Sequence, residues 1–352
     1  MLVQDYPAVA TWINKQLRLS IAKNCCYDRA QAQRARRKHV RRKIGRVMGF
    51  NESHIQHYRE HGYAVVENFL TSEELSRSRD EIEAFIPGWL DYAANPTGCR
   101  PVGWDEPQRS RRGVRFPFRG EQLNANTLHP ELRRFASLMC DGEPLFCEQS
   151  DLTYKCSGHY GDVEQHIHLD YVNHTLAYPP DSPRYWQTAF LIYYTDVAIH
   201  QAPTAVCSWQ HYRDEILWPA VYEPSQRPEL YDNEVKVTVP AGSVLAYSMR
   251  TFHRGTAFQA EGARVGHFIS YAPKRPKWLG IVGWPEQGVY KSFSAWMAQA
   301  TLEERELLGF PAPGDDYWSE ETLAGVAARF PSMDMQPYRT KTQGIGEVDR
   351  DE

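Results

Sequence analysis

The sequence predicts an α+β protein in which a β-sandwich or closed jelly roll is flanked by helices. Seven short runs of β-forming residues lie between Leu145 and Pro273 and are separated by turn signals, a sequence pattern typical of such β-rich cores. Segments with helical periodicity precede and follow them. Hydrophobic residues make up 42% of the chain and charged residues 24%, which excludes a disordered, collagen-like or coiled-coil protein.

The segments before the β-rich region can be assigned from caps, periodicity and composition. Thr71 and Glu74 have the spacing of a capping box, so a helix is expected to begin there. The expected elements, in order, are a helix from Asn51 or Ser53 to Gly62, a strand over 63–69, a helix from 71 to about 85, a Pro-, Gly- and Arg-rich loop or lid over 95–125, and a helix over 130–139.

Similar local signals assign the strands of the β-rich region and the helices at the end of the chain. Turn signals such as Pro179-Pro180 and Glu261-Gly262 bound runs rich in β-branched and aromatic residues. The expected strands are 145–155, 163–171, 187–196, 203–209, 234–239, 243–248 and 263–271, and two helices, about 291–308 and 318–329, complete the chain.

The first fifty residues differ in charge from the rest. They contain twelve basic and two acidic residues, a net charge of +10, whereas residues 51–352 carry -14 of the total of -4. Nine basic side chains and no acid occupy 29–46. We therefore expect a basic helical N-terminal extension over 1–50, a β-barrel domain over 51–275, and a C-terminal helical extension over 276–352 that packs on the barrel.

A basic arm of this kind suits a nucleic acid or an acidic partner. The acidic body and the lack of a recognisable nucleic-acid-binding motif argue against nucleic acid. The arm is instead expected to pack on its own body, on a second copy of the chain in a homo-oligomer, or on an acidic partner.

Two further observations concern the compartment. No run approaches the roughly 18 apolar residues of a membrane span, and no signal peptide is apparent, so no membrane association is expected. The seven cysteines contain no C-x-x-C pair, which favours a reducing environment over a disulfide framework. We predict a cytoplasmic protein.

The densest group of potential metal ligands is His166, His168 and Asp170. Side chains of a strand alternate between faces, so the three would project from one side of the strand expected over 163–171, and one ion could contact two of them. By itself an H-x-D triplet is a weak signal, because a histidine on a strand is more often a structural polar group.

A second block further along the chain strengthens the metal interpretation. The run over 243–248 is followed by a turn, by His253 and, eleven residues later, by Arg264. Two imidazoles and one carboxylate occupy one face of an octahedral non-haem iron and leave three positions open for a bidentate oxoacid and oxygen. A buried arginine can hold the far carboxylate of that oxoacid.

With these elements the sequence resembles the phytanoyl-CoA dioxygenase family of iron(II)- and 2-oxoglutarate-dependent oxygenases, with a layout similar to that of bacterial ectoine hydroxylases. The resemblance runs from about Phe50 to Pro273 and includes the opening segment 57–70. It implies a double-stranded β-helix, the cupin-like jelly roll, with flanking helices. It also implies Fe(II), 2-oxoglutarate as cosubstrate, and O2.

Carried over to this chain, the resemblance implies a role for each matching residue. His168, Asp170 and His253 would be the iron ligands and catalytic centre, and Arg264 would bind the distal carboxylate of 2-oxoglutarate. The segment 149–155 resembles one in ectoine hydroxylases, which implies that Lys155, thirteen residues before His168, also binds 2-oxoglutarate and that Gln149 contacts substrate.

The implied reaction is hydroxylation of an unactivated C–H bond of a small-molecule metabolite, with release of succinate and CO2. Related halogenases have glycine where this chain has Asp170, which favours hydroxylation. Desaturation, cyclisation and ring expansion would use the same ligands. Two other classes stay open: a non-catalytic jelly-roll binding protein, and a cupin-type metal enzyme without 2-oxoglutarate, in which Arg264 would have no task.

Substrate contacts are expected near the motifs, where aromatic side chains could hold apolar groups or cations. The candidates are His166, Tyr171, Trp186, Trp209, Trp104 and Tyr160, each of which could equally serve the core. The loop arginines Arg109, Arg111, Arg112, Arg115 and Arg119 could receive an anionic substrate or simply be solvated.

Two departures from the family pattern limit the substrate assignment. The segment 201–211 keeps only Pro203, Ser208 and His211 of a commoner Gly-Pro and Pro-Gly-Ser-His pattern, and Gly255 replaces the serine that ectoine hydroxylases have two residues after the distal histidine. Ectoine itself is therefore not implied as the substrate.

Overall fold

The computed structural model describes residues 49–96, 115–158, 162–175, 179–275, 284, 291–315, 317–318 and 320–342. The chain divides into two compact units, Met1–Val47 and Met48–Glu352, and all described residues lie in the second. The expected N-terminal helical extension, Trp104, Tyr160, Arg109, Arg111 and Arg112 lie outside the described residues. The expected division at residue 275 stays a prediction.

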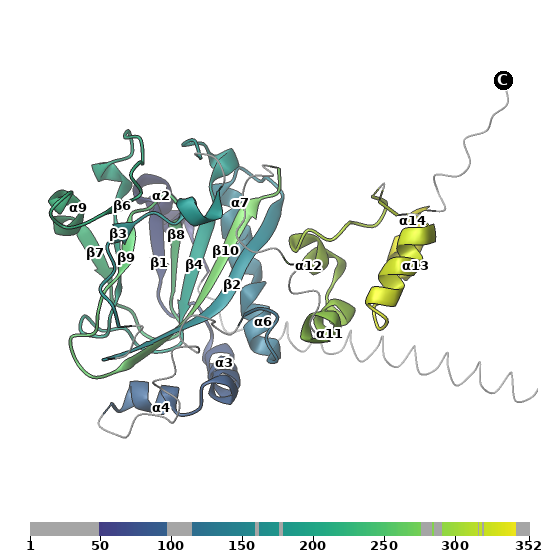
Figure 1. Ribbon diagram of the computed structural model, residues 1–352, viewed down its shortest axis with the longest axis horizontal. Helices are drawn as coiled ribbons and strands as arrows, with labels where there is room; N and C mark the ends of the chain where they lie inside the picture. The colour runs from purple at the N-terminus through teal and green to yellow at the C-terminus, as the bar shows by residue number, and fades with distance from the viewer. Residues whose placement is uncertain are drawn as a thin grey trace, which may run out of the picture. The chain divides into compact units, whose positions relative to one another are not determined.

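An antiparallel five-stranded sheet forms the centre of the described unit (Figure 1). All six residues of its middle strand are buried, because the sheet is covered on both faces. The strands in spatial order are β1 (Tyr63–Val66), β8 (Val244–Ser248), β4 (Thr188–Tyr193), β10 (Ala263–Pro273) and β2 (Leu145–Cys156).

A second antiparallel sheet, at the left of Figure 1, has shorter strands. In spatial order they are β6 (Val221–Tyr222), β3 (Ile167–His168), β9 (His253–Gly255), β5 (Thr204–Cys207) and β7 (Glu234–Val237). This sheet pairs His168 directly with His253, two of the expected metal ligands.

Helices cover the central sheet on the side that the second sheet leaves free. Phe135 of the helix α7 stacks on Phe50, with ring centroids 4.0 Å apart, and meets Phe190 of β4 at 6.1 Å. The described helices of the whole chain, on this side and elsewhere, are α2 (Glu52–His61), α3 (Ser72–Phe85), α4 (Trp89–Ala94), α6 (Glu121–Thr127), α7 (Pro130–Met139), α8 (Tyr171–His174), α9 (Pro228–Asp232), α11 (Lys291–Gln299), α12 (Leu302–Leu307), α13 (Glu320–Arg329) and α14 (Gln336–Thr342).

The C-terminal helices α11 to α14 lie beyond the β2 edge of the central sheet, where α12 contacts β2 (Figure 1). The single helix expected over 291–308 is in fact two helices. The first ends at Gln299, and Thr301 begins the second through a capping box with Glu304. The sequence carries that signal in the same form as at Thr71, where the expected helix start is confirmed.

The strand expected over 163–171 is wrong in extent. Only Ile167 and His168 are extended, Asp170 lies in a turn, and α8 begins at Tyr171. The loop expected over 95–125 contains the helix α6, which begins at Glu121. In the described part of the chain, no helix is both long and apolar enough to cross a membrane.

Candidate active site

Three potential metal ligands converge between the sheets. The ligand atoms of His168, Asp170 and His253 all lie within 4.8 Å of one another. Asp170 Oδ1 is 3.6 Å from His168 Nε2, and Asp170 Oδ2 is 3.3 Å from His253 Nε2. Two imidazoles and a carboxylate at these separations fit one face of an octahedral transition metal.

The local fold fixes which nitrogen of each imidazole faces this point. His168 Nδ1 lies 2.8 Å from the carbonyl oxygen of His166, and His253 Nδ1 lies 2.9 Å from that of Thr251. Since each Nδ1–H donates to a carbonyl, each Nε2 keeps its lone pair for a metal. The β3–β9 pairing brings the two rings together, with centroids 4.5 Å apart.

The carboxylate and the imidazoles influence each other's ionisation. Burial alone would raise the pKa of Asp170, but the charge and hydrogen bond of His253, with a contribution from His168, hold it well below its ordinary value. Burial would lower the pKa of His253, and Asp170 outweighs that effect and raises it. Asp170 is therefore an anion at neutral pH, as a metal ligand must be.

Two cations lie at another part of the same cavity. Lys155 of β2 and Arg264 of β10 occupy directly opposed positions in the strand pairing. Lys155 Nζ donates to the Thr256 carbonyl at 2.8 Å, and Arg264 Nη1 donates to the Ala202 carbonyl. Among the described residues, no carboxylate forms a salt bridge with either side chain.

The surroundings of Lys155 and Arg264 disfavour the charged form of both side chains. Burial, and then the nearby charge of Arg264, lowers the pKa of Lys155 to about 8, and burial lowers the pKa of Arg264. Like charges directly opposite each other in a sheet are destabilising, and buried charges require partners. The pair is therefore suited to an anionic ligand that enters the cavity.

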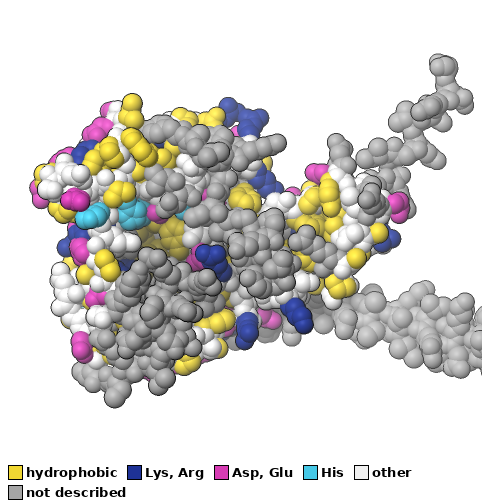
Figure 2. Space-filling view, viewed as in Figure 1, with side chains coloured by type: hydrophobic (Ala, Val, Ile, Leu, Met, Phe, Trp, Pro, Cys, Tyr) yellow, Lys and Arg dark blue, Asp and Glu magenta, His cyan; other side chains and the backbone are white. Residues whose placement is uncertain are grey.

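The cavity that holds both groups has a volume of about 560 Å³, within the range of small-molecule sites. Figure 2 shows histidine side chains at the surface over β3 and β9 with hydrophobic side chains beside them. The lining residues are Thr153, Tyr154, Lys155, Val163, Gln165, His168, Asp170, Leu191, Thr204, Tyr247, His253, Gly255, Arg264 and Phe268.

Gly255 is explained by a close contact in this cavity. A Cβ atom at Gly255 would lie 2.7 Å from Gln165 Oε1 and 3.5 Å from Lys155 Nζ. Gln165 Oε1 accepts a hydrogen bond from the Gly255 amide at 2.7 Å. The glutamine side chain therefore takes the space that a serine side chain would need.

The residues expected to contact substrate lie elsewhere among the described residues. His166 is exposed, Gln149 Nε2 donates to Asp151, the Tyr171 hydroxyl donates to the Leu217 carbonyl, and Trp186 and Trp209 pack together with ring centroids 5.1 Å apart. None of the five lines the cavity, and their assignment as substrate contacts stays a prediction. Of the described loop arginines, Arg115 pairs with Asp151 at 3.0 Å and Arg119 is exposed.

Sequence reasoning missed Tyr247 of β8. Its hydroxyl donates to Asp170 Oδ2 at 3.1 Å, and its ring centroid lies 4.6 Å from that of His253. Burial, and then the charge of Asp170, raises the pKa of Tyr247 well above its ordinary value, so the hydroxyl stays a donor. The alternation of the run over 243–248 contained the only signal, since it places Leu245 and Tyr247 on one face.

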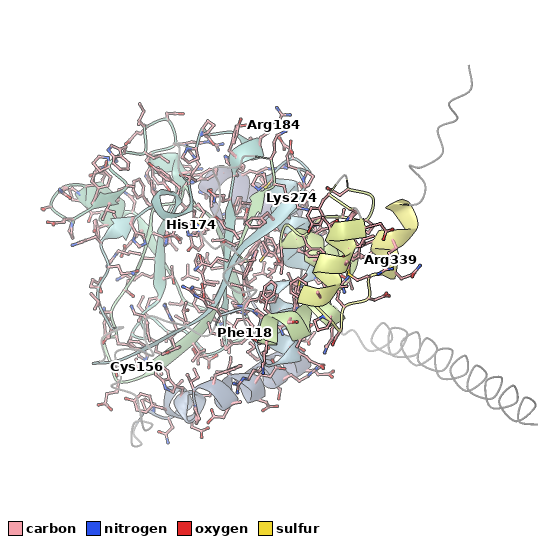
Figure 3. The ribbon with its side chains drawn as sticks, turned by 45° about the vertical axis from the view of Figure 1, so that its right-hand side comes forward. Phe118, Cys156, His174, Arg184, Lys274 and Arg339 are labelled. Carbon is pink, nitrogen blue, oxygen red and sulfur yellow. The ribbon has the colours of Figure 1, made fainter. Side chains whose placement is uncertain are left out.

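Sequence reasoning also missed a buried ion pair that holds the turn after Asp170. His174, the last residue of α8, bonds through Nδ1 to Glu148 Oε1 at 3.0 Å, and Gln187 Nε2 donates to the same oxygen at 2.7 Å. Burial would lower the pKa of His174, but Glu148 outweighs it and raises that pKa. Figure 3 shows His174 in the β-rich body, away from Arg339 of α14.

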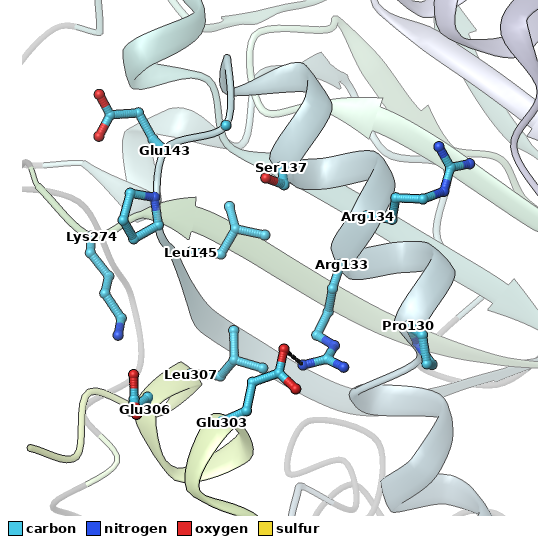
Figure 4. A pocket seen from close by; sticks show the side chains of 12 residues that line it. Pro130, Arg133, Arg134, Ser137, Glu143, Leu145, Lys274, Glu303, Glu306 and Leu307 are labelled. Carbon is cyan, nitrogen blue, oxygen red and sulfur yellow. Dashed lines mark ion pairs between the residues drawn. The ribbon is translucent and has the colours of Figure 1, made fainter. Parts of the chain in front are cut away.

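Another cavity, of about 480 Å³, lies between α7, the start of β2 and α12 (Figure 4). Its charged lining is already paired in part, because Arg133 Nη1 lies 3.0 Å from Glu303 Oε1. The three potential metal ligands are not among its lining residues. Among the described residues, the three potential metal ligands line the first cavity.

Comparison with known proteins gives one sequence match and several structural ones. The profile of the family described as phytanoyl-CoA dioxygenase matches residues 58–266. No curated protein matches the sequence.

Two structural matches represent a set of similar ones, which all have identities under 25% and TM-scores under 0.5. The non-haem α-ketoglutarate-dependent carbocyclase SnoK from nogalamycin biosynthesis is 19% identical, with a TM-score of 0.48 over 69% of this chain and 92% of SnoK. HygX from Streptomyces hygroscopicus, crystallised with nickel and 2-oxoglutarate, is 16% identical, with a TM-score of 0.47 over 64% and 88% of the two chains.

Proposed function

This chain belongs to the phytanoyl-CoA dioxygenase family, and from that premise we propose that it is an iron(II)- and 2-oxoglutarate-dependent oxygenase of a small-molecule metabolite. We take its two antiparallel sheets as the halves of a double-stranded β-helix. His168, Asp170 and His253 bind the iron, and Arg264 and Lys155 bind the cosubstrate.

The single observation that carries the proposal is the opposed pair of Lys155 and Arg264. Arg264 is buried and Lys155 half-buried, and they face each other across β2 and β10. Neither forms a salt bridge with a described carboxylate, although the charges of Asp162 and Glu164 act on Lys155. A dicarboxylate that reaches from the metal ligands to this pair would satisfy both. 2-Oxoglutarate has the required two carboxylates and a keto group for chelation.

The donor set supports iron as the metal. Two neutral imidazole nitrogens and one carboxylate oxygen, with open positions beside them, are the ligand set of non-haem Fe(II) oxygenases. When bound, iron(II) would supply activation of O2 coupled to oxidative decarboxylation of 2-oxoglutarate to succinate and CO2. The chain orients the two ligand imidazoles through the carbonyls of His166 and Thr251.

The rest of the cavity suits an apolar part of a substrate. Leu191, Val163 and Phe268 line it, and the described lining residues contain no carboxylate other than that of Asp170. A volume of about 560 Å³ exceeds what a five-carbon dicarboxylate needs. We propose hydroxylation of a C–H bond as the reaction, with desaturation or cyclisation as alternative outcomes at the same centre.

Anaerobic titration tests the proposal. Purified protein with iron(II) should bind 2-oxoglutarate and develop a visible metal-to-ligand absorption band, and the band should be absent in Arg264→Ala at the same ligand concentration. A screen of candidate metabolites for stimulated succinate release then identifies substrate. Wild-type protein that binds iron but never 2-oxoglutarate would favour the non-catalytic binding protein instead.

A further inference from the structure

One side chain contacts two of the three proposed iron ligands from outside. Tyr247 of β8 is 3% exposed, its hydroxyl donates to Asp170 Oδ2 at 3.1 Å, and its ring lies 4.6 Å from the His253 ring at an interplanar angle of 50°. The backbone holds this position firmly, because Tyr247 is paired with Tyr63 on β1 and with Ala189 on β4.

The two oxygens of Asp170 have different surroundings. Oδ1 lies 3.6 Å from His168 Nε2, whereas Oδ2 lies near His253 Nε2 and also accepts the Tyr247 hydrogen bond. A carboxylate can bind a metal through one oxygen or through both. In a six-coordinate site with two imidazoles, the second mode removes one of the three positions that a bidentate oxoacid and oxygen require.

We propose that Tyr247 is a positioning residue that restricts Asp170 to binding the metal through a single oxygen. The inference rests on the proposed function. It adds how three coordination positions of the metal stay open for the oxoacid and oxygen. The hydroxyl occupies a lone pair of Oδ2, and the ring, packed on His253, prevents the carboxylate from rotating toward that side.

The same residue is also part of the cavity wall. Tyr247 lines the cavity, and its ring lies 6.3 Å from the ring of Phe268, which lines it as well. A ligand that presses on Phe268 therefore acts within one contact of the side chain that orients Asp170. Tyr247 therefore lies both in the wall of the cavity and against the side chain of Asp170.

The test compares Tyr247→Phe with the wild-type chain, using Co(II) in place of iron. Co(II) absorption in the visible range changes with coordination number, so it reports the binding mode of Asp170 without turnover. We expect an altered spectrum in Tyr247→Phe and an affinity of the Co(II)-loaded protein for 2-oxoglutarate that falls tenfold or more, about the effect of losing a hydrogen bond to a charged group.

Tyr58→Phe is the matched control. The Tyr58 side chain is fully buried, and its hydroxyl contacts Thr188 Oγ1 at 3.1 Å and also Ser248, so the substitution likewise removes a buried tyrosine hydroxyl, but one that does not bond to Asp170. It should keep both the wild-type spectrum and the wild-type 2-oxoglutarate affinity.

Two results would overturn the positioning role: a Tyr247→Phe protein with the wild-type spectrum and affinity, or equal changes in Tyr58→Phe, which would mark a general effect of instability. In both cases the wild-type chain still binds Co(II) and 2-oxoglutarate, so the proposed function stands. A wild-type chain that binds neither would overturn the proposed function and the positioning role together.

Discussion

Lys155 and Arg264 face each other directly across the β2–β10 ladder, and neither forms a salt bridge with a carboxylate of the described residues. Another buried arginine, in the second sheet, does pair with carboxylates. Arg254, on β9, pairs through Nε with Glu234 Oε2 at 2.6 Å and also bonds to Glu164. Among the described residues, Arg254 thus has carboxylate partners, whereas Arg264 bonds to the Ala202 carbonyl and has no salt bridge.

Replacing Arg264 by methionine should weaken 2-oxoglutarate binding on the order of 100-fold, since two charge-assisted hydrogen bonds of about 1.5 kcal/mol each are lost. The ligand-free protein should not become less stable, because an unpaired buried charge is removed. Arg254→Met is the control with the opposite pattern: it leaves Glu234 unpaired and should lower the Tm. Calorimetric titration measures the affinity for 2-oxoglutarate, and thermal melts measure the Tm. A normal affinity in Arg264→Met would exclude Arg264 as the residue that binds the distal carboxylate.

The lowered pKa of Lys155 predicts a pH dependence of cosubstrate binding. With a pKa of about 8 in the free protein, Lys155 is charged at pH 7 and largely neutral at pH 9. A dianion prefers the charged form, so the affinity should fall by up to tenfold per pH unit above about 8. Lys155→Met should bind 2-oxoglutarate weakly and with no such dependence, and a wild-type affinity that is constant from pH 7 to 9.5 would contradict the assignment.

The same pKa affects folding with the opposite sign. Because the folded pKa of Lys155, about 8, lies below its unfolded value, the unfolded chain binds more protons between pH 8 and that value. This residue's contribution to the free energy of unfolding should therefore become more favourable as the pH rises through that window. Urea denaturation of wild type and Lys155→Met at several pH values isolates the contribution as the difference between the two proteins.

The Glu148–His174 pair predicts a stability effect at lower pH. The folded pKa of His174 is raised, so its stabilising contribution is complete below its unfolded value of about 6.5 and is lost as the pH rises through the folded value. Glu148→Gln should cost about 3–5 kcal/mol at pH 6, because it leaves a buried imidazolium without its partner. The double variant with His174→Gln should recover most of that loss, and an additive loss would argue against a charged pair.

Metal binding should stabilise the folded chain by mass action. Added Co(II) or Fe(II) should raise the Tm, and a chelator should reverse the rise. Asp170→Asn should reduce the effect strongly, because a neutral amide replaces the anionic ligand. Asp151→Asn is a matched control, since Asp151 is a buried carboxylate of the central sheet that pairs with Arg115 and is not one of the three potential ligands. An equal shift in Asp170→Asn and wild type would remove Asp170 from the metal site.

Local signals in the sequence were sufficient to predict the starts of the first two described helices. The capping box at Thr71 is confirmed, and of the two expected helix starts Asn51 is the N-cap, because both side chains bond within three residues of themselves. The expected strand over 63–69 is present as β1, although it ends at Val66. Interactions of this range depend little on what the rest of the chain does.

The residue types of the candidate site were likewise accessible from the sequence. Spacing and chemistry drew attention to His168, Asp170, His253 and Arg264, the family resemblance implied their roles, and the fold brings all four to one cavity. The roles of these residues remain predictions for the experiments above.

Tertiary structure alone decided the partners. Alternation within a strand shows which side chains share a face, but not which strand lies beside it, so the pairing of His168 with His253 and of Lys155 with Arg264 followed only from the sheets. The same limit hid the contact of Tyr247 with Asp170, and it hid the packing of Trp186 against Trp209, two residues whose role as substrate contacts stays a prediction. The sequence determined which chemical groups were available, and long-range strand pairing determined which of them meet.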